Sequence, residues 1–145
     1  MNNMAVAQEY SAGIIVFTDT VSPGKRLYLL LHYTSGHWDF AKGHIEGAET
    51  KEEAAYRELF EEAGIHATLF ADFMETIQYW LTNKRHERVK KEVYFFVGRA
   101  IETEVKLSHE HIDFAWLSYT QAMEWLTYQN ARDILTLADE FLRLK

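Results

Sequence analysis

The chain has 145 residues, of which 48% are hydrophobic and 26% charged, an ordinary composition for a globular protein. Its formal net charge of -7 repels polyanions at long range, so long nucleic acid is a disfavoured partner unless the basic residues gather on one face. The absence of cysteine excludes a disulfide framework and thiolate chemistry.

The apolar stretches of the chain are short. None approaches the roughly 20 uninterrupted residues that a membrane helix needs. The segment Met1–Tyr10 lacks the cationic start and apolar run of a secretion signal. We therefore expect one domain over residues 1–145, located in the cytoplasm and without a membrane partner.

Two β-type runs come first in chain order. They are Ser11–Thr18 (SAGIIVFT) and Leu27–His32 (LYLLLH). The turn-forming sequence Ser22-Pro23-Gly24-Lys25 lies between them. This pattern predicts a β-hairpin with a long loop.

A glycine-bearing loop over Gly43–Gly47 precedes a run of strong helix formers at Lys51–Ala63. Thr50 followed by Glu53 fits a capping box at the start of this run, and Gly64 fits a left-handed stop after its end. The sequence therefore predicts a helix with both ends marked.

The second half of the chain predicts three more strands and then helices. Aromatic and β-branched residues are concentrated in Phe73–Leu81, Glu92–Ile101 and Ile112–Leu117. Ser118 can cap a short helix through Leu126, and apolar residues recur at helical spacing toward the C-terminus, which predicts one or two closing helices. The expected fold class is α/β, with a mixed sheet flanked by helices.

Three glutamates of the predicted helix share one face. Glu58, Glu61 and Glu62 stand at spacings i, i+3 and i+4, which brings three like charges close together. Hard divalent cations such as Mg²⁺ neutralise such a cluster and keep coordination positions open for phosphates. The competing interpretation is a solvated surface helix, because glutamate is a good helix former.

The residues around this cluster decide between the two interpretations. The pattern is Gly43, five residues, Glu49, seven residues, and then Arg57-Glu58-Leu59-Phe60-Glu61-Glu62-Ala63-Gly64-Ile65. It resembles the signature of the Nudix hydrolases at every defined position. The resemblance implies an α/β/α sandwich and a metal-dependent hydrolysis of phosphoanhydrides.

The expected metal is Mg²⁺, with Mn²⁺ as an alternative. The resemblance implies that Glu58 and Glu62 bind it and that Glu61 binds it or acts as the base. A backbone carbonyl near Gly43 can complete its oxygen shell. Arg57 stays protonated and cannot be a base, so we expect it to hold Glu49 by a bidentate ion pair.

Residues outside the signature resemble one branch of the family. Trp38–His44 (WDFAKGH) and Leu107–His111 (LSHEH) are similar to segments of the asymmetrical bis(5'-nucleosyl)-tetraphosphate hydrolases. In that branch the enzyme cuts diadenosine tetraphosphate into ATP and AMP. The resemblance thus implies a small nucleotide substrate.

The same resemblance implies roles for four more residues. Lys42, His44 and Lys91 match phosphate-facing residues, with His44 also a catalytic candidate, although surface lysines and a loop histidine are the alternative interpretation. Glu110 matches a glutamate near the metals, so it is an extra ligand or the base. A histidine metal site at His109–His111 is disfavoured because the carboxylates prefer a harder ion than zinc.

Tyr79 and Tyr128 match aromatic residues that sandwich an adenine ring. Packing in the core is the competing explanation for both. Two residues depart from the branch: Ala41 replaces a common proline, and Phe95 replaces a common tyrosine, so a hydroxyl is absent there.

Two other functions remain open. The first is a pyrophosphohydrolase of nucleoside triphosphates or of 5'-triphosphorylated RNA. The longer RNA needs a continuous basic path, which Lys84, Arg85, Arg88, Lys90 and Lys91 provide if they share a face. The second is a non-catalytic nucleotide sensor, if the glutamates serve no metal. The sensor hypothesis is disfavoured because three crowded carboxylates are costly without a cation.

Overall fold

The computed structural model describes residues 7–145. Residues 1–6 lie outside the described part. The expectation that Met1–Tyr10 is not a secretion signal falls mostly on these residues and rests on the sequence alone. The elements follow in the order β1 (Ala7–Thr18), β2 (Leu27–Tyr33), β3 (Trp38–Asp39), β4 (Ala41–His44), α1 (Lys51–Ala63), β5 (Ala67–Leu69), β6 (Glu75–Thr82), β7 (Arg88–Ala100), β8 (His111–Leu117), α2 (Tyr119–Trp125) and α3 (Gln129–Arg143).

The strands form one mixed sheet, as predicted. Strand β1 lies at its centre, parallel to β7 and antiparallel to β2 and β4. Strands β5 and β6 pair with β7, while β3 and β8 pair with β2. The predicted hairpin is confirmed, because Phe17 of β1 pairs with Tyr28 of β2.

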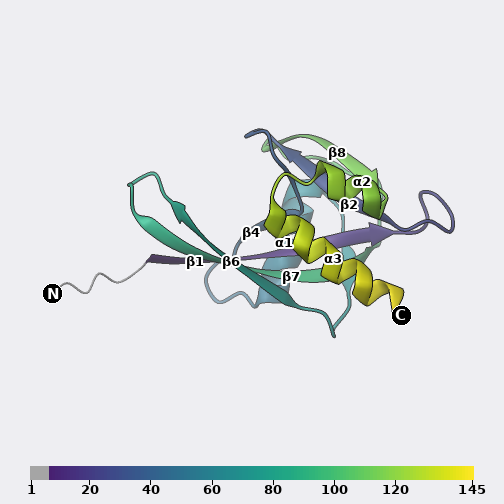
Figure 1. Ribbon diagram of the computed structural model, residues 1–145, viewed down its shortest axis with the longest axis horizontal. Helices are drawn as coiled ribbons and strands as arrows, with labels where there is room; N and C mark the ends of the chain where they lie inside the picture. Colours follow the sequence, from purple (N-terminus) through teal and green to yellow (C-terminus); the bar gives the residue numbers. More distant parts are fainter. Residues whose placement is uncertain (1–6) are drawn as a thin grey trace.

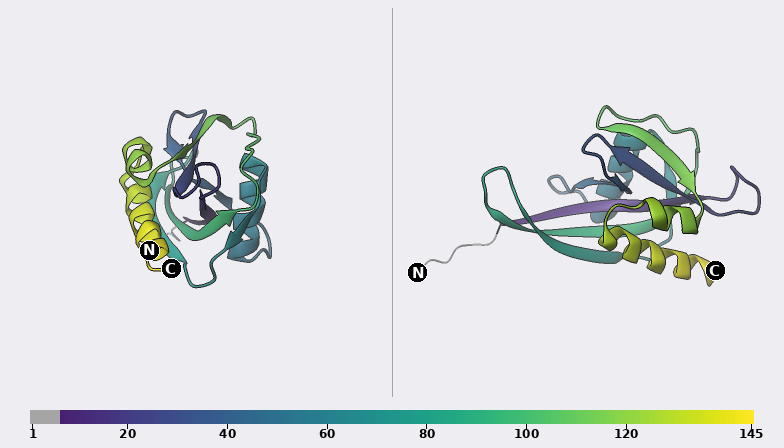
Figure 2. Two further views of the ribbon diagram at one scale, coloured as in Figure 1. Left: turned by 90° about the vertical axis from the view of Figure 1, so that its right-hand side faces the viewer. Right: turned by 45° about the horizontal axis from the view of Figure 1, so that its top comes forward.

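Helices cover both faces of the sheet. In the end-on view of Figure 2, α1 lies on one side of the strands, and α2 and α3 lie on the other. Each side has its own apolar core. Leu59 of α1 packs with Ile14 and Leu31, whereas Ile134 of α3 packs with Ile15 and Phe95. The fold is therefore the predicted α/β/α arrangement, seen from its broad side in Figure 1.

Helix α1 begins and ends at the predicted residues. Thr50 accepts a hydrogen bond from the backbone of Glu53, whose side chain in turn accepts one from the backbone of Thr50. Gly64 ends the helix with a positive φ of 68°. Its buried face consists of Ala54, Ala55, Leu59, Glu62 and Ala63. The small and apolar members of this face let the helix lie close to β1 and β4, with one carboxylate on the same buried side.

The structure also departs from the predicted elements. Gly43 lies in strand β4, paired with Ala12 of β1, rather than in a loop. The short strands β3 and β5 are additional. Within residues 7–145, no helix combines the length and apolar character that crossing a membrane requires.

Candidate active site

Two of the three predicted glutamates are packed inside the structure. The side chain of Glu62 is 6% exposed and that of Glu58 is 14% exposed, whereas that of Glu61 is 56% exposed. The three residues leave α1 on the side of β4. Helix α1 thus presents an inner pair of carboxylates and one outer carboxylate.

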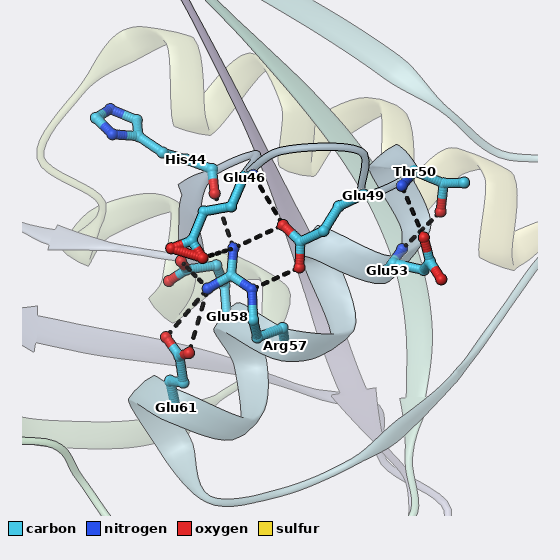
Figure 3. Close-up of polar contacts among 8 residues, drawn as sticks. All are labelled: His44, Glu46, Glu49, Thr50, Glu53, Arg57, Glu58 and Glu61. Carbon is cyan, nitrogen blue, oxygen red and sulfur yellow. Dashed lines mark hydrogen bonds and ion pairs between the residues drawn. The ribbon is translucent and has the colours of Figure 1, made fainter.

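Arg57 links the carboxylates to the preceding loop (Figure 3). It donates to both oxygens of Glu49, at 2.6 and 2.9 Å, which is the predicted bidentate ion pair. Its Nη1 donates to Glu58 at 2.8 Å and to both oxygens of Glu61 at 3.2 Å. Its Nη2 donates to the backbone carbonyl of His44 at 2.9 Å. The hydrogen bond from Arg57 lowers the pKa of Glu49 to about 2, so this loop anchor stays ionised at neutral pH.

Gly43 is required by its close approach to Glu58. A Cβ atom at position 43 would lie 2.0 Å from the carboxyl carbon of Glu58 and 2.2 and 2.4 Å from its oxygens. Such distances are far inside van der Waals contact. Only glycine therefore lets the Glu58 carboxylate lie against β4.

Two hydrogen-bond donors and one ring nitrogen lie around one oxygen of Glu62. The hydroxyl of Tyr33 lies 3.0 Å, the backbone N–H of Lys42 3.4 Å, and Nε2 of His111 3.5 Å from Oε1. Tyr33 and His111 come from the neighbouring strands β2 and β8. The sheet therefore fixes this carboxylate from the side opposite the helix.

The charge balance of the inner pair fits a divalent cation. Burial raises the pKa of Glu58 above its usual range, the hydrogen bond from Arg57 opposes this rise, and the carboxyl of Glu62 adds to it. Two buried carboxylates side by side thus carry more negative charge than one guanidinium offsets. Carboxylate oxygens are the donors that Mg²⁺ and Mn²⁺ prefer. In the part of the chain that is described, no group of at least three His, Cys, Asp or Glu side chains is preformed for a metal.

A cavity of about 510 Å³ lies on the α3 side of β4. The predicted pair Tyr79 and Tyr128 both line it, together with Phe95 at its apolar wall. Tyr79 is half-buried on β6, and Tyr128 immediately precedes α3. The full lining is His37, Asp39, Lys42, Ile77, Tyr79, Trp80, Leu81, Phe95, Tyr128, Gln129, Asn130 and Ala131. Aromatic walls with a few amide and charged groups suit a planar heterocycle.

Strand β4 joins this cavity to the carboxylates. The backbone N–H of Lys42 faces Glu62, while its side chain lines the cavity and forms an ion pair with Asp39 at 2.6 Å. Burial lowers the pKa of Lys42, but Asp39 and, to a smaller extent, Tyr79 and Glu62 raise it, and the net change is a raised pKa that retains the ammonium. A ligand spanning both places therefore passes over Lys42.

The other predicted phosphate-facing residues gather at the open end of β4. His44 is exposed, with Nε2 3.5 Å from Nζ of Lys91 and 3.4 Å from Glu9. Burial and the charge of Lys42 lower the pKa of Lys91. Cationic side chains that repel one another in this way favour an anion between them.

Glu110 lies in the turn before β8, where its backbone N–H donates to Ser108 and its carbonyl accepts from Thr34. Its exposed side chain has no hydrogen bond or ion pair to any residue of the described range 7–145. The contacts with Ser108 and Thr34 fix the backbone of Glu110 and leave its carboxylate exposed.

The basic residues of the β6–β7 hairpin do not share one face. Lys91 pairs with Tyr79 of the cavity side, whereas Lys90 pairs with Trp80. Because side chains alternate along a strand, Arg88 and Lys90 point away from Lys91. Arg88 indeed stacks on Trp80 with its guanidinium carbon 5.0 Å from the ring centre. A long RNA substrate would need these basic side chains on one face, and Lys91 does not share a face with Arg88 and Lys90.

The sequence prediction missed Tyr33, Asp39 and His111 as site residues. They lie on strands β2, β3 and β8, whereas the glutamates lie on α1, and sheet pairing brings the three strands together. The sole sequence signal was local: Asp39 and His111 fall inside the WDFAKGH and LSHEH segments. Tyr33 has no comparable signal.

Comparison with known proteins identifies the class of this enzyme. The model of the NUDIX domain matches residues 8–138. This match spans well over half of the chain, and the chain therefore belongs to the Nudix family. It is a Nudix hydrolase, an enzyme of the pyrophosphohydrolase type.

Its relatives include named tetraphosphatases. The asymmetrical bis(5'-nucleosyl)-tetraphosphatase of Sus scrofa is 32% identical over 123 residues, which cover 79% of this chain and 80% of the relative. The Caenorhabditis elegans protein of the same name is 29% identical over 135 residues, which cover 91% and 95%. A crystal structure of a C. elegans Ap4A hydrolase binary complex matches with a TM-score of 0.78 and 27% identity, covering 94% of this chain and 99% of that one.

The anchoring role of Arg57 leads to a first prediction. Lysine at this position keeps the charge but cannot hold Glu49 by two parallel bonds while also reaching Glu58 and Glu61. We expect Arg57→Lys to lower kcat/KM by about 10- to 100-fold, the usual effect of losing a residue that orients ligating groups. Steady-state kinetics measures this loss.

The matched control is Arg99→Lys, which alters an exposed ion pair with Asp19 at the far end of β7. Exposed pairs contribute little, so this variant should retain normal kinetics. Equal kinetics for the two variants would contradict the anchoring role of Arg57.

Proposed function

We propose that this protein hydrolyses a phosphoanhydride bond of dinucleoside polyphosphates, with diadenosine tetraphosphate cut into ATP and AMP, in the presence of Mg²⁺ or Mn²⁺. One observation is the main support for the proposal. Lys42 lies between the cavity and the buried carboxylates of α1: its side chain lines the cavity together with Tyr79 and Tyr128, and its backbone N–H donates to Glu62. The names of the most similar relatives support the same substrate class.

The proposed substrate-binding residues contact different parts of the nucleotide. Tyr79 and Tyr128 stack on one base, and Lys42 lies where the phosphate chain leaves the cavity. His44 and Lys91 bind phosphate oxygens at the open end of β4.

Glu58 and Glu62, with the backbone carbonyl of Gly43 and with Glu61, would hold the divalent cation. When bound, this cation polarises the phosphoanhydride and makes a water molecule nucleophilic at neutral pH. Arg57 keeps Glu58 and Glu61 in place through its hydrogen bonds. The fixed carboxylates thus orient the reacting groups without moving during the reaction.

The proton acceptor is one of two exposed carboxylates, Glu61 and Glu110. Glu61 already contacts Arg57, while Glu110 lies exposed in the turn before β8. Removal of a general base typically lowers the rate by about 100- to 10,000-fold. Comparison of Glu61→Gln with Glu110→Gln at saturating substrate assigns the role to the variant with the larger loss of kcat.

The substrate proposal is tested by measuring kcat/KM for diadenosine tetraphosphate, GTP and a 5'-triphosphorylated RNA under identical metal conditions. We expect the first substrate to have the highest value, because the two tyrosines flank room for a base and Lys91 is separated from the other cations of the hairpin. If the RNA had the highest kcat/KM, the proposed substrate would be wrong, although the protein would still be a Nudix hydrolase.

A further inference from the structure

A buried pair of side chains lies behind Glu62. The rings of Tyr33 and His111 are 4.3 Å apart, and the Tyr33 hydroxyl and Nε2 of His111 lie 3.0 and 3.5 Å from the same carboxylate oxygen. The side chain of His111 is fully buried. Within residues 7–145, its Nε2 is a buried nitrogen without a hydrogen-bond partner. Burying such a group is unfavourable unless the site uses it.

The contacts of His111 indicate which of its nitrogens carries the proton. The hydroxyl oxygen of Ser108 accepts from the backbone N–H of Glu110 at 3.2 Å and lies 3.0 Å from Nδ1 of His111. If the single hydroxyl proton of Ser108 is donated to Nδ1, every group of the turn is satisfied. Nε2 then carries a ring proton and lies 3.5 Å from Oε1 of Glu62.

Tyr33 supplies a second donor to the same oxygen. Its one hydroxyl proton has two acceptors, Oε1 of Glu62 at 3.0 Å and the carbonyl oxygen of Phe40 at 2.9 Å, and the charged carboxylate is the stronger of the two. Burial and the carboxylate of Glu62 raise the pKa of Tyr33 well above its usual value, so the hydroxyl keeps its proton. Tyr33 of β2 and His111 of β8 thus lie at one oxygen of Glu62, and the carboxyl of Glu58 is close enough to interact with the Glu62 carboxyl.

We propose that Tyr33 and His111 are positioning residues for Glu62: they hold Oε1 from the sheet side so that the carboxylate is presented to a cation beside Glu58. The inference rests on the proposed function only in that Glu62 binds a divalent cation. At 3.5 Å, Nε2 is slightly beyond an ordinary hydrogen bond. A small displacement of the carboxylate closes this contact.

Two substitutions of His111 separate positioning from mere space filling. In His111→Gln the amide nitrogen stands the same number of bonds from the backbone as Nε2, so a donor still faces Glu62. In His111→Asn the amide reaches only the place of Nδ1, so the contact with Ser108 survives and the donor toward Glu62 is lost. Tyr33→Phe removes only the hydroxyl and tests the second donor independently.

The measurement is titration calorimetry of Mn²⁺ into protein stripped of metal, without nucleotide. We expect His111→Asn and Tyr33→Phe to weaken Mn²⁺ binding by about 10- to 100-fold, as loss of an outer partner of a ligand usually does. His111→Gln should stay within a few-fold of the unmodified protein. Thermal unfolding in a chelator shows which variants fold. If the histidine variants do not fold, the Mn²⁺ affinity of Tyr33→Phe alone decides whether the donors position Glu62.

Equal Mn²⁺ affinity in Tyr33→Phe, His111→Asn and the unmodified protein would overturn the positioning role. So would equal weakening in His111→Asn and His111→Gln, since filling of space would then explain both. If the unmodified protein itself bound no Mn²⁺, the metal-dependent function and this inference would fall together. Unchanged variants of a protein that binds Mn²⁺ defeat the inference alone.

Discussion

Replacing Glu62 by glutamine is expected to lower kcat by about 100-fold or more, beyond the ~10- to 100-fold loss typical of residues that only orient a ligand. The substitution preserves shape and removes the charge of the most buried glutamate of α1. It also places an amide where the donors of Tyr33 and Lys42 now meet a carboxylate oxygen. Steady-state kinetics over a range of Mg²⁺ concentrations measures the effect.

The control for this substitution is Glu52→Gln, an exposed residue in the first turn of the same helix. It removes the same charge from α1 and should leave kcat unchanged. Normal turnover by Glu62→Gln would refute the metal role of this residue. Nucleotide binding without metal-dependent turnover in the unmodified protein would instead favour the sensor hypothesis.

Substituting Gly43 by alanine is the second change for which we expect a large effect. The new Cβ would overlap the Glu58 carboxyl group, whose atoms lie 2.0 to 2.4 Å from that position. Either the carboxylate or β4 must shift by about an ångström, and a shift of this size in a catalytic group costs on the order of 100-fold in rate. We therefore expect kcat to fall by roughly that factor, as measured at saturating substrate and metal.

Gly47→Ala is the matched control, because a Cβ there meets nothing within 4 Å. Its positive φ of 53° carries a backbone cost of about 1–2 kcal/mol, so thermal unfolding should register Gly47→Ala while kcat changes little. A fully active Gly43→Ala enzyme would show that Glu58 does not need its place against β4.

Local signals account for the parts of the fold that were predicted well. Helix α1 has a capping box at Thr50 and a glycine stop at Gly64, and both ends fall where these signals put them. Strands β1 and β7 begin earlier than predicted, at Ala7 and Arg88. Apart from Ala7, Tyr10 and the buried Val89, their first residues are charged or amide side chains that are exposed or half-buried, so no clear hydrophobic pattern marks them. These segments are strands because they pair with each other in parallel.

The sequence predicted the acidic residues of the candidate site, but it did not predict the residues of the sheet that hold them. The spacing of Glu58, Glu61 and Glu62 follows from helix geometry, and the Arg57–Glu49 pair was expected from the charges alone. The donors of Glu62 come from strands that are distant in sequence, and no local rule anticipates that convergence. The exposed position of Glu110 depends on how the turn before β8 packs, and no local pattern predicts that either.

The most direct test of the central claim is chromatographic analysis of the products formed from diadenosine tetraphosphate by the purified protein with Mg²⁺, beside a sample containing a chelator. We predict ATP and AMP in equal amounts with Mg²⁺ and no turnover in the chelator. Two molecules of ADP per substrate, or a rate unaffected by the chelator, would contradict this prediction.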